Sequence, residues 1–155
     1  MRGWSVSGMP LPGFTVDVHR EAVVRFCDAI GEPRGEYRHS ATARAAGYRD
    51  VLVPPTYLFS LELQRPQPYL AVEMLGASVS DVRHAEQSFD YGVACCAGDR
   101  LRFELVVGDY YEKRGGRLGF LERRATVTRD DGALVAVLVN LLAIRWPEGV
   151  VSEKS

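Results

Sequence analysis

The apolar positions of the chain follow a helical period in the first half and an alternating period in the second half. In the first half, the positions that recur at helical spacing are Ala22, Val23, Phe26, Cys27 and Ile30. They predict an amphipathic helix over residues 19–30, with Asp17 placed to cap its start and Gly31 its end. A short strand over residues 13–18 is expected to lead into this helix.

Two further helices are predicted before the middle of the chain. Residues 41–46 favour a short helix that is ended by the following glycine. Pro54 and Pro55 can open a helix but cannot lie inside one, so the almost entirely apolar residues 57–63 are expected to begin a buried helix. Polar side chains are concentrated between these apolar segments, in residues 32–40, and a pocket is usually lined by a few polar groups grouped in this way.

The second half of the chain predicts four long strands. They cover residues 84–91, 99–111, 118–128 and 133–146. The segments Arg-Gly-Gly-Arg at 114–117 and Arg-Asp-Asp-Gly at 129–132 predict two hairpins, with Asp131 and Gly132 in the second tight turn. Residues 134–144 are apolar at nearly every position, so this strand has two apolar faces and is expected to be central in the sheet.

Helices followed by an antiparallel meander predict an α+β fold in which the sheet wraps around one buried helix. The chain has 155 residues, and one domain has about 150 residues on average. The expected organisation is a single domain over residues 1–155, with a loose N-terminal arm or an extended lead-in at residues 1–12 and a C-terminal tail at residues 147–155.

Composition limits the classes of partner. The formal net charge is -1 and the basic residues are scattered, which gives no electrostatic reason to expect nucleic acid or a membrane surface as a partner. Three cysteines, two of them adjacent, do not make a disulfide framework. No stretch approaches the about 18 apolar residues of a membrane span, and no cluster has metal-ligand spacing. We therefore expect a soluble, cytoplasmic protein without a metal.

The polar loop and the turn after it resemble a known family. The residues whose spacing carries the resemblance are Gly31, Glu32, Tyr37, Ala43 and Gly47, followed by the Pro-Pro-Thr turn. This pattern is similar to the hydratase loop of MaoC-like enoyl thioester hydratases, especially the FAS1-like dehydratase N-terminal domains. The segment Ala-Gly-Asp-Arg-Leu-Arg-Phe at residues 97–103 is similar to the second half of that family, so the resemblance covers residues 14–145.

The resemblance implies a single hot-dog fold, in which an antiparallel sheet wraps around a central buried helix. It implies an acyl thioester substrate, carried on coenzyme A or on the phosphopantetheine of an acyl carrier protein, and no further cofactor. It also implies a homodimer, or a heterodimer with a second hot-dog subunit, in fatty acid or polyketide metabolism.

Two departures from the family pattern concern catalysis, and the first is in the loop. The family's hydratases use an Asp and a His five residues later, in a loop that reads Gly-Asp-x-Asn-Pro-Ile-His, and residues 31–37 correspond to it here. Glu32 holds the Asp position with a carboxylate displaced by one methylene, and Tyr37 holds the His position. Tyrosine, with an ordinary pKa of about 10, is a weak base near neutral pH but can donate a hydrogen bond.

The second departure is at the turn. The family has a His-Gly pair here, and its glycine amide helps to hold the thioester oxygen. Pro54 and Pro55 stand in those places, and proline has no N–H to donate. Thr56 at the helix start could supply a donor instead. By resemblance, the expected substrate-binding residues are Arg38, Pro55, Thr56, Tyr57 and Tyr91.

Under the leading hypothesis, the chain is a dehydratase or hydratase, an (R)-specific lyase that acts at the β-carbon of 3-hydroxyacyl or enoyl thioesters. Glu32 and His39 would be its acid and base, because His39 lies two residues after Tyr37 in the same loop. Tyr37 and Thr56 would orient the thioester. The alternative for His39 is a surface histidine beside Arg38.

Two alternatives remain open. The chain resembles the non-catalytic, substrate-binding half of two-part dehydratases, in which a second hot dog carries the Asp and the His. It could also be a hot-dog thioesterase, or an enzyme that adds another nucleophile to an enoyl thioester, with Glu32 activating water or an amine. In any of these proteins, Arg123, Arg124 and Arg145 could contact the phosphates of coenzyme A or of a carrier arm.

Overall fold

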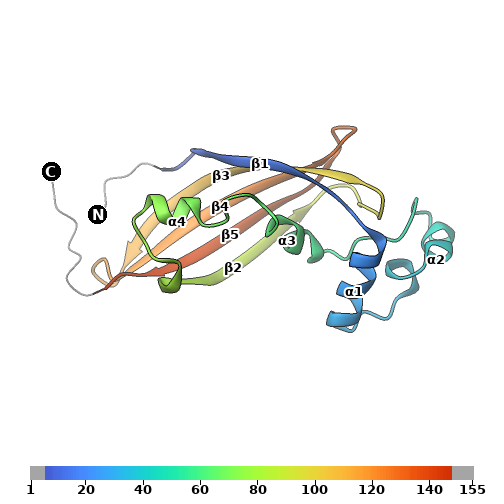
Figure 1. Cartoon of the computed structure of the whole chain (residues 1–155), viewed down its shortest axis with the longest axis horizontal. Coiled ribbons are helices and arrows are strands. Elements are labelled where there is room, and N and C mark those ends of the chain that lie inside the picture. The colour runs from blue at the N-terminus through green and yellow to red at the C-terminus, as the bar shows by residue number, and fades with distance from the viewer. Residues whose placement is uncertain (1–5, 148–155) are drawn as a thin grey trace.

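Five antiparallel strands form one sheet in the order β1-β3-β4-β5-β2 in the computed structural model, which describes residues 6–147 (Figure 1). The strands are β1 (Pro10–Asp17), β2 (Val82–Tyr91), β3 (Arg100–Lys113), β4 (Leu118–Arg129) and β5 (Leu134–Arg145). Strands β3, β4 and β5 form a meander, and β1 and β2 pair with its two outer sides. The four strands predicted in the second half of the chain are confirmed, with bounds shifted by one or two residues at most ends.

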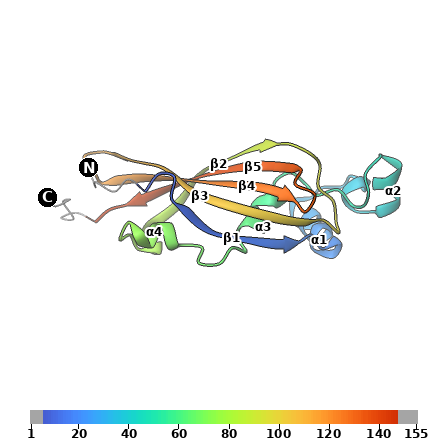
Figure 2. The same ribbon diagram turned by 90° about the horizontal axis from the view of Figure 1, so that it is seen from above.

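The helical segments lie against one face of the sheet and beyond one of its ends, as Figure 2 shows. They are α1 (Arg20–Ile30), η1 (Gly35–Tyr37), α2 (Ser40–Ala45), α3 (Tyr57–Glu62), α4 (Leu70–Met74) and η2 (Val79–Asp81). Segments α3 and α4 cover the face, whereas α1 and α2 gather at the end. Within residues 6–147, every helix is too short or too polar to cross a membrane.

Helix α3 is the buried helix that the apolar segment after the proline pair predicts. Its buried residues are Tyr57, Leu58, Leu61 and Glu62. Helix α4 is not predicted from the sequence pattern, but its buried residues Ala71 and Val72 continue the same covering layer. The α+β architecture, with a sheet around one buried helix, is confirmed.

Helix α1 ends as its sequence predicts but begins differently. Gly31 has a φ of 70°, and its N–H donates to the carbonyls of Asp28 and Cys27, which is the left-handed C-cap expected of glycine. The capping role predicted for Asp17 is wrong, because His19 precedes the first turn and makes no side-chain capping bond. Ile30, expected on the apolar face, is 52% exposed.

Both predicted hairpins are present. Arg114, Gly115 and Gly116 have φ values of 54°, 64° and 83°, so the β3–β4 turn uses the left-handed region that glycine enters without strain. In the β4–β5 turn, Gly132 has a φ of 81°. β5 lies between β4 and β2, which confirms its predicted internal position, and its outward apolar residues are half-buried rather than buried. The reason is that the described helical segments cover only one face of the sheet.

The N-terminal segment is more ordered than its composition indicates. Strand β1 begins at Pro10, Val6 is 6% exposed, and the N–H of Gly8 donates to the carbonyl of Val107 over 2.8 Å. Residues 6–12 are therefore an extended lead-in to the sheet and not a loose arm. Residues 1–5 of the predicted arm and residues 148–155 of the predicted tail lie outside the described residues.

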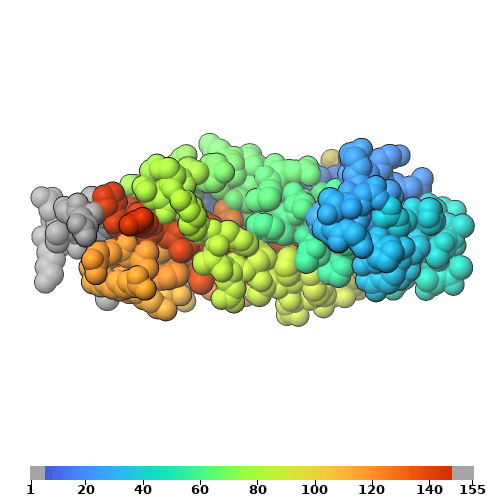
Figure 3. Space-filling model, turned by 90° about the horizontal axis from the view of Figure 1, so that it is seen from below, coloured from blue at the N-terminus to red at the C-terminus, as the bar shows by residue number. Residues whose placement is uncertain are grey.

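The two edges of the sheet differ in their capacity to pair with another strand. β1 contains Pro10 and Pro12, which have no N–H, and its register is interrupted between Leu11 and Phe14. Prolines and bulges are the features that protect an edge from pairing. β2 has ten residues without proline and is largely exposed, and its register with β5 is interrupted only in its first half, between His84 and Glu86. Figure 3 views the molecule from this edge, where the yellow-green atoms of β2 are uncovered by other elements.

Candidate functional site

A cavity of about 230 Å³ lies between the chain that leads into α3 and the chain that follows β2. It is lined by Tyr37, Tyr48, Leu52, Val53, Pro54, Pro55, Leu58, Tyr91, Gly92, Val93, Ala94, Cys95 and Val135. Three of the residues predicted for the site, Tyr37, Pro55 and Tyr91, are among them. This cavity is the candidate site.

Backbone contacts fix the distance between the two loops that form the cavity. The N–H of Val53 donates to the carbonyl of Cys95 over 3.0 Å, which joins the loop before α3 to the loop after β2. The carboxylate of Asp99 accepts a hydrogen bond from the N–H of Cys96 over 2.9 Å, and Asp99 is only 5% exposed. The walls are therefore held in place by the fold.

Asp50 ties the polar loop to α1 and α2. Its two oxygens accept hydrogen bonds from Arg20 over 3.1 and 2.7 Å, from the hydroxyl of Ser40 over 2.9 Å and from the N–H of Val51 over 2.7 Å. The contact with Arg20, more than the others, holds the pKa of Asp50 well below its usual range. Asp50 is thus an ionised anchor next to the cavity wall.

Glu32 is held by an arginine and does not line the cavity. Its oxygens accept two hydrogen bonds from the Arg34 side chain, each of 2.9 Å, and one from the Arg34 N–H over 3.0 Å. These bonds lower the pKa of Glu32 to about 2. Glu32 is therefore a carboxylate at neutral pH, and both of its oxygens are engaged by Arg34.

Tyr37 is the loop residue that does reach the cavity. It is 7% exposed, and the guanidinium of Arg34 lies 4.7 Å from the centre of its ring. Burial raises the pKa of Tyr37, so its hydroxyl stays protonated at neutral pH and can donate a hydrogen bond but cannot act as a base.

The other two loop residues predicted for the site face away from the cavity. His39 is exposed at the start of α2 and is not a lining residue. Arg38 donates to the carbonyl of Glu32 over 2.9 Å and pairs with the carboxylate of Asp28 at the end of α1. Glu32 and His39 therefore do not form an acid and base pair at the cavity, and Arg38 fastens the loop to α1.

At the turn, prolines replace hydrogen-bond donors in the cavity wall. Pro54 and Pro55 line the cavity, whereas Thr56 is exposed and is not a lining residue. Helix α3 has only six residues, and Thr56 makes no capping bond, so the predicted donor role of Thr56 has no support in the geometry. Tyr57 points into the core, with its ring centre 4.9 Å from that of Phe26.

The chemistry of the lining is that of a binding site. Its side chains are aliphatic or proline apart from the three tyrosines and Cys95. Burial raises the pKa of the Cys95 thiol, which therefore remains protonated and unreactive. The lining thus offers hydroxyl donors and apolar surface, while the nearby ionised groups are paired outside it.

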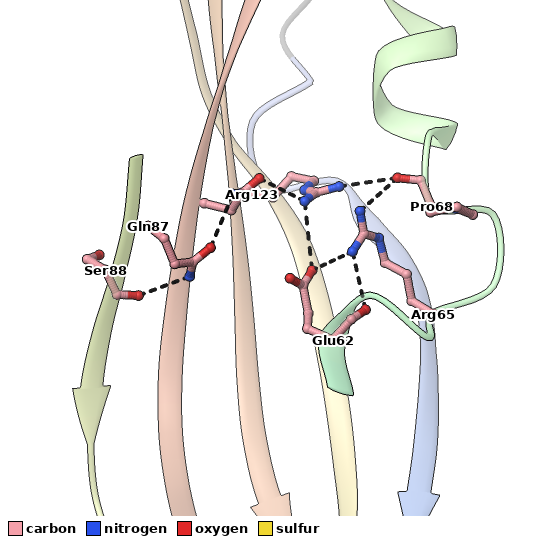
Figure 4. A network of polar contacts seen from close by, with 7 residues as sticks. Glu62, Arg65, Pro68, Gln87, Ser88 and Arg123 are labelled. Carbon is pink, nitrogen blue, oxygen red and sulfur yellow. Dashed lines mark hydrogen bonds and ion pairs between the residues drawn. The ribbon is translucent and has the colours of Figure 1, made fainter. Parts of the chain in front are cut away.

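A second polar assembly lies deeper in the molecule, between α3 and the sheet (Figure 4). Oε1 of Glu62 lies 2.9 Å from Nη1 of Arg65 and 3.9 Å from Nη2 of Arg123, and all three side chains are at most 5% exposed. Both arginines also donate to the carbonyl of Pro68, over 2.8 and 3.2 Å. Burial, and then the proximity of Arg65, lower the pKa of Arg123 to about 10. The two guanidinium groups share the single carboxylate of Glu62.

The assembly continues across the sheet to its free edge. Arg123 donates to Oδ1 of Asn140 over 2.8 Å, and Nδ2 of Asn140 donates to Oε1 of Gln87 on β2 over 3.1 Å. Among the described residues, Oε2 of Glu62 and Nε of Arg123 are buried without a hydrogen-bond partner. We refer to Glu62, Arg65, Arg123, Asn140 and Gln87 as the polar row.

Sequence reasoning missed the polar row. It grouped Arg123 with Arg124 as possible contacts for the phosphates of coenzyme A or a carrier arm, but only Arg124 is exposed, while Arg123 is 5% exposed. The alternation along β4 contained the signal, because Leu121, Arg123 and Ala125 share the inward face.

Comparisons with known proteins agree with this fold. The family model described as "FAS1-like, dehydratase domain region" matches residues 5–138. A UPF0336 protein of Saccharopolyspora erythraea is 33% identical over 144 residues, which is 90% of each chain. A UPF0336 protein of Streptomyces griseus is 30% identical over 139 residues, again 90% of each chain.

Solved structures share the architecture at lower identity. A chain of the HadBC (3R-hydroxyacyl-ACP dehydratase) complex from Mycobacterium tuberculosis superimposes with a TM-score of 0.73 and 22% identity, over 90% of this chain and 98% of that one. The (R)-hydratase from A. caviae involved in PHA biosynthesis gives a TM-score of 0.67 and 15% identity, over 95% and 100%. These neighbours are hot-dog proteins, so the predicted hot-dog fold is confirmed. By its sequence and its architecture, the chain belongs to the family of FAS1-like dehydratase domains.

Proposed function

We propose that this chain is the acyl-binding, non-catalytic subunit of a two-subunit 3-hydroxyacyl thioester dehydratase, in which a second hot-dog subunit supplies the acid and the base. The observation that carries the proposal is the cavity. It is lined by Tyr37, prolines and aliphatic side chains, while Glu32 is bound by Arg34 and His39 lies outside.

The reaction requires groups that this cavity does not provide. Hydration of an enoyl thioester, and its reverse, needs a base, an acid and a donor for the thioester oxygen. The protonated Tyr37 can donate a hydrogen bond, but Pro54 and Pro55 remove the backbone donors expected at the turn. The geometry therefore favours binding of the acyl group over self-sufficient catalysis by Glu32 and His39.

The size and the rim of the cavity support a partner subunit. Small-molecule sites commonly have about 300–1,000 Å³, whereas this cavity has about 230 Å³. Tyr91 and Val93 line it and are 48% and 43% exposed, and Leu134, hydrogen-bonded through its carbonyl to Val93, is 44% exposed. A second subunit that covered these apolar side chains would also complete the walls.

The free edge of β2 is the surface on which we place that subunit. Its ten residues carry no proline, and its end at Tyr91 forms part of the cavity. Two structural neighbours, the HadBC and ChsH1-ChsH2 complexes of Mycobacterium tuberculosis, support the presence of a partner subunit. The acyl group would arrive as a thioester of coenzyme A or of an acyl carrier protein, with no other cofactor.

The test compares binding with turnover for the purified chain without a second subunit. Calorimetric titration with saturated acyl-CoA thioesters measures binding, and mass spectrometry of reactions with crotonyl-CoA and longer enoyl-CoA measures turnover. We expect binding without 3-hydroxyacyl product or free acid, and the same binding by Glu32→Gln. Hydration by the chain alone would contradict the proposal, and its loss in Glu32→Gln would identify a self-sufficient enzyme. A folded chain that binds no acyl thioester would also overturn it.

A further inference from the structure

The members of the polar row on strands β4, β5 and β2 lie directly opposite one another, so the row crosses the sheet at a single position along the strands. Arg123 on β4 and Asn140 on β5 are direct cross-strand partners, and Asn140 is in turn the partner of Gln87 on β2. Glu62 and Arg65 meet this level from the helical layer above the sheet. The five side chains therefore span the space between α3 and the sheet.

Apolar layers lie on both sides of this level. The neighbouring inward pair on the cavity side is Ala125 and Leu138, and these belong to the cluster that includes Leu58. The neighbouring pair on the far side is Leu121 and Leu142, and these belong to a separate cluster under α4. The polar row thus divides the apolar core into two parts.

The cavity and the polar row lie along the same elements. On β2, Tyr91 lines the cavity, Phe89 packs against the first cluster and Gln87 belongs to the row, all three on one face of the strand. Four residue steps of about 3.4 Å separate Tyr91 from Gln87, or about 14 Å. On α3, Leu58 lines the cavity and Glu62 lies one turn further on. An apolar chain that extended from the cavity between α3 and β2 would meet the polar row.

An alkyl chain could not replace the contacts at that level. The row already holds two guanidinium groups against one carboxylate, with one oxygen of Glu62 and one nitrogen of Arg123 unpartnered within residues 6–147. A methylene group offers no hydrogen bond, and separating buried charges from their partners is costly. The first apolar cluster can yield to an acyl chain, because its contacts are exchanged for similar ones.

We propose that the polar row is the end wall of the acyl site and limits binding to acyl chains that end on the cavity side of Glu62 and Arg123. This inference rests on the proposed function, because it assumes that the cavity receives an acyl group. It makes the polar row a determinant of chain-length specificity.

The test measures how affinity depends on acyl length. Butyryl-, octanoyl-, dodecanoyl- and hexadecanoyl-CoA are titrated into the full chain and into a triple variant with Glu62→Met, Arg65→Met and Arg123→Met. Replacing every charge of a buried ion cluster by apolar residues of similar volume is often neutral or stabilising, so this variant is expected to fold. We expect the natural chain to bind hexadecanoyl-CoA poorly, and the variant to bind it at least about tenfold more tightly than the natural chain does.

Arg124→Met is the matched control, because Arg124 follows Arg123 on the same strand but is exposed and pairs with Glu122. A contact of Arg124 with the coenzyme A phosphates would affect all four thioesters equally, so the dependence of affinity on acyl length should equal that of the natural chain. An unchanged profile in the folded triple variant would overturn the end wall but leave the proposed function intact. Absence of binding at every length would overturn the proposed function itself.

A second variant keeps the inference testable if the triple variant does not fold. Leu138→Phe fills the apolar layer before the polar row without touching a charge. It should shorten the longest acyl chain that binds while leaving butyryl-CoA affinity unchanged. Equal affinities for all four thioesters in Leu138→Phe and the natural chain would show that the acyl chain does not approach the polar row.

Discussion

Two glutamates, each followed closely by an arginine, differ in how far their ion pairs are exposed to solvent. Glu32 is bound by Arg34 in the loop at the end of the sheet, where the two side chains are 18% and 58% exposed. Glu62 is bound by Arg65 beneath the helical layer, where the two side chains are 2% and 5% exposed. The residue types and contact distances are alike, but solvent reaches the first pair, mainly at Arg34, and is excluded from the second.

The difference shows which of the two carboxylates demands an explanation. An exposed ion pair adds little to folding and readily ties down a loop, as Glu32 does. A buried ion cluster costs desolvation that an apolar replacement would avoid, so its presence is not explained by stability. The family resemblance pointed to Glu32, whereas the energetics point to Glu62 and its partners.

The largest expected effect is that of removing Glu62 alone. Glu62→Ala leaves Arg65 and Arg123 buried without their carboxylate, and breaking a buried pair in this way typically costs about 3–5 kcal/mol of unfolding free energy. Urea denaturation followed by circular dichroism measures the loss. Glu122→Ala, which removes the partner of the exposed Arg124, is the control and should change stability little. Equal losses of unfolding free energy in Glu62→Ala and Glu122→Ala would contradict the distinction between buried and exposed ion pairs.

The next prediction removes the whole charge cluster. The triple variant with Glu62→Met, Arg65→Met and Arg123→Met has no uncompensated buried charge. Its unfolding free energy should therefore exceed that of Glu62→Ala, and replacements of this kind range from neutral to stabilising by about 1–4 kcal/mol. The same urea titration measures both variants. A triple variant less stable than Glu62→Ala would show that the polar row is needed for folding.

Most of the fold was predictable because it depends on local periodicity. The β3–β5 meander follows from alternation and from the turns at Gly115 and Gly132, and the end of α1 follows from Gly31. Helix α4 was missed because five residues are too few to display a helical period. Val6 was misjudged because its burial depends on contacts with distant strands rather than on its neighbours in the chain.

The site was only half predictable. Tyr37, Pro55 and Tyr91 line the cavity, because a shared architecture preserves the positions of its loops. The direction of a loop side chain depends on its hydrogen-bond partners. Arg34 binds the carboxylate of Glu32 outside the cavity, and the spacing of residues in the sequence does not reveal this contact. The polar row was out of reach for a related reason, since its residues come from four separate elements and the loop after α3.

A smaller effect is expected from releasing Glu32. Arg34→Ala removes the bonds that hold the pKa of Glu32 at about 2, so this pKa should rise towards the ordinary value, which is about 4.3. Carboxyl-detected NMR titration measures it directly. Arg38→Ala is the matched control, because Arg38 has the smallest of the influences on this pKa and should shift it less. A larger shift in Arg38→Ala would mean that Arg34 is not the residue that holds the carboxylate.

The smallest expected effect is the contribution of Glu32 to acid stability. Its pKa in the folded chain, about 2, is lower than in the unfolded chain, where it is about 4.3. Folding is therefore favoured by the ionised group at pH values above the unfolded-state pKa, and this contribution disappears as the pH falls towards the folded-state pKa. Glu32→Gln lacks the contribution at every pH. Thermal unfolding midpoints of the natural chain and Glu32→Gln should therefore differ slightly at pH values above the unfolded-state pKa and converge as the solution is acidified, and a difference that grew on acidification would contradict the ion pair with Arg34.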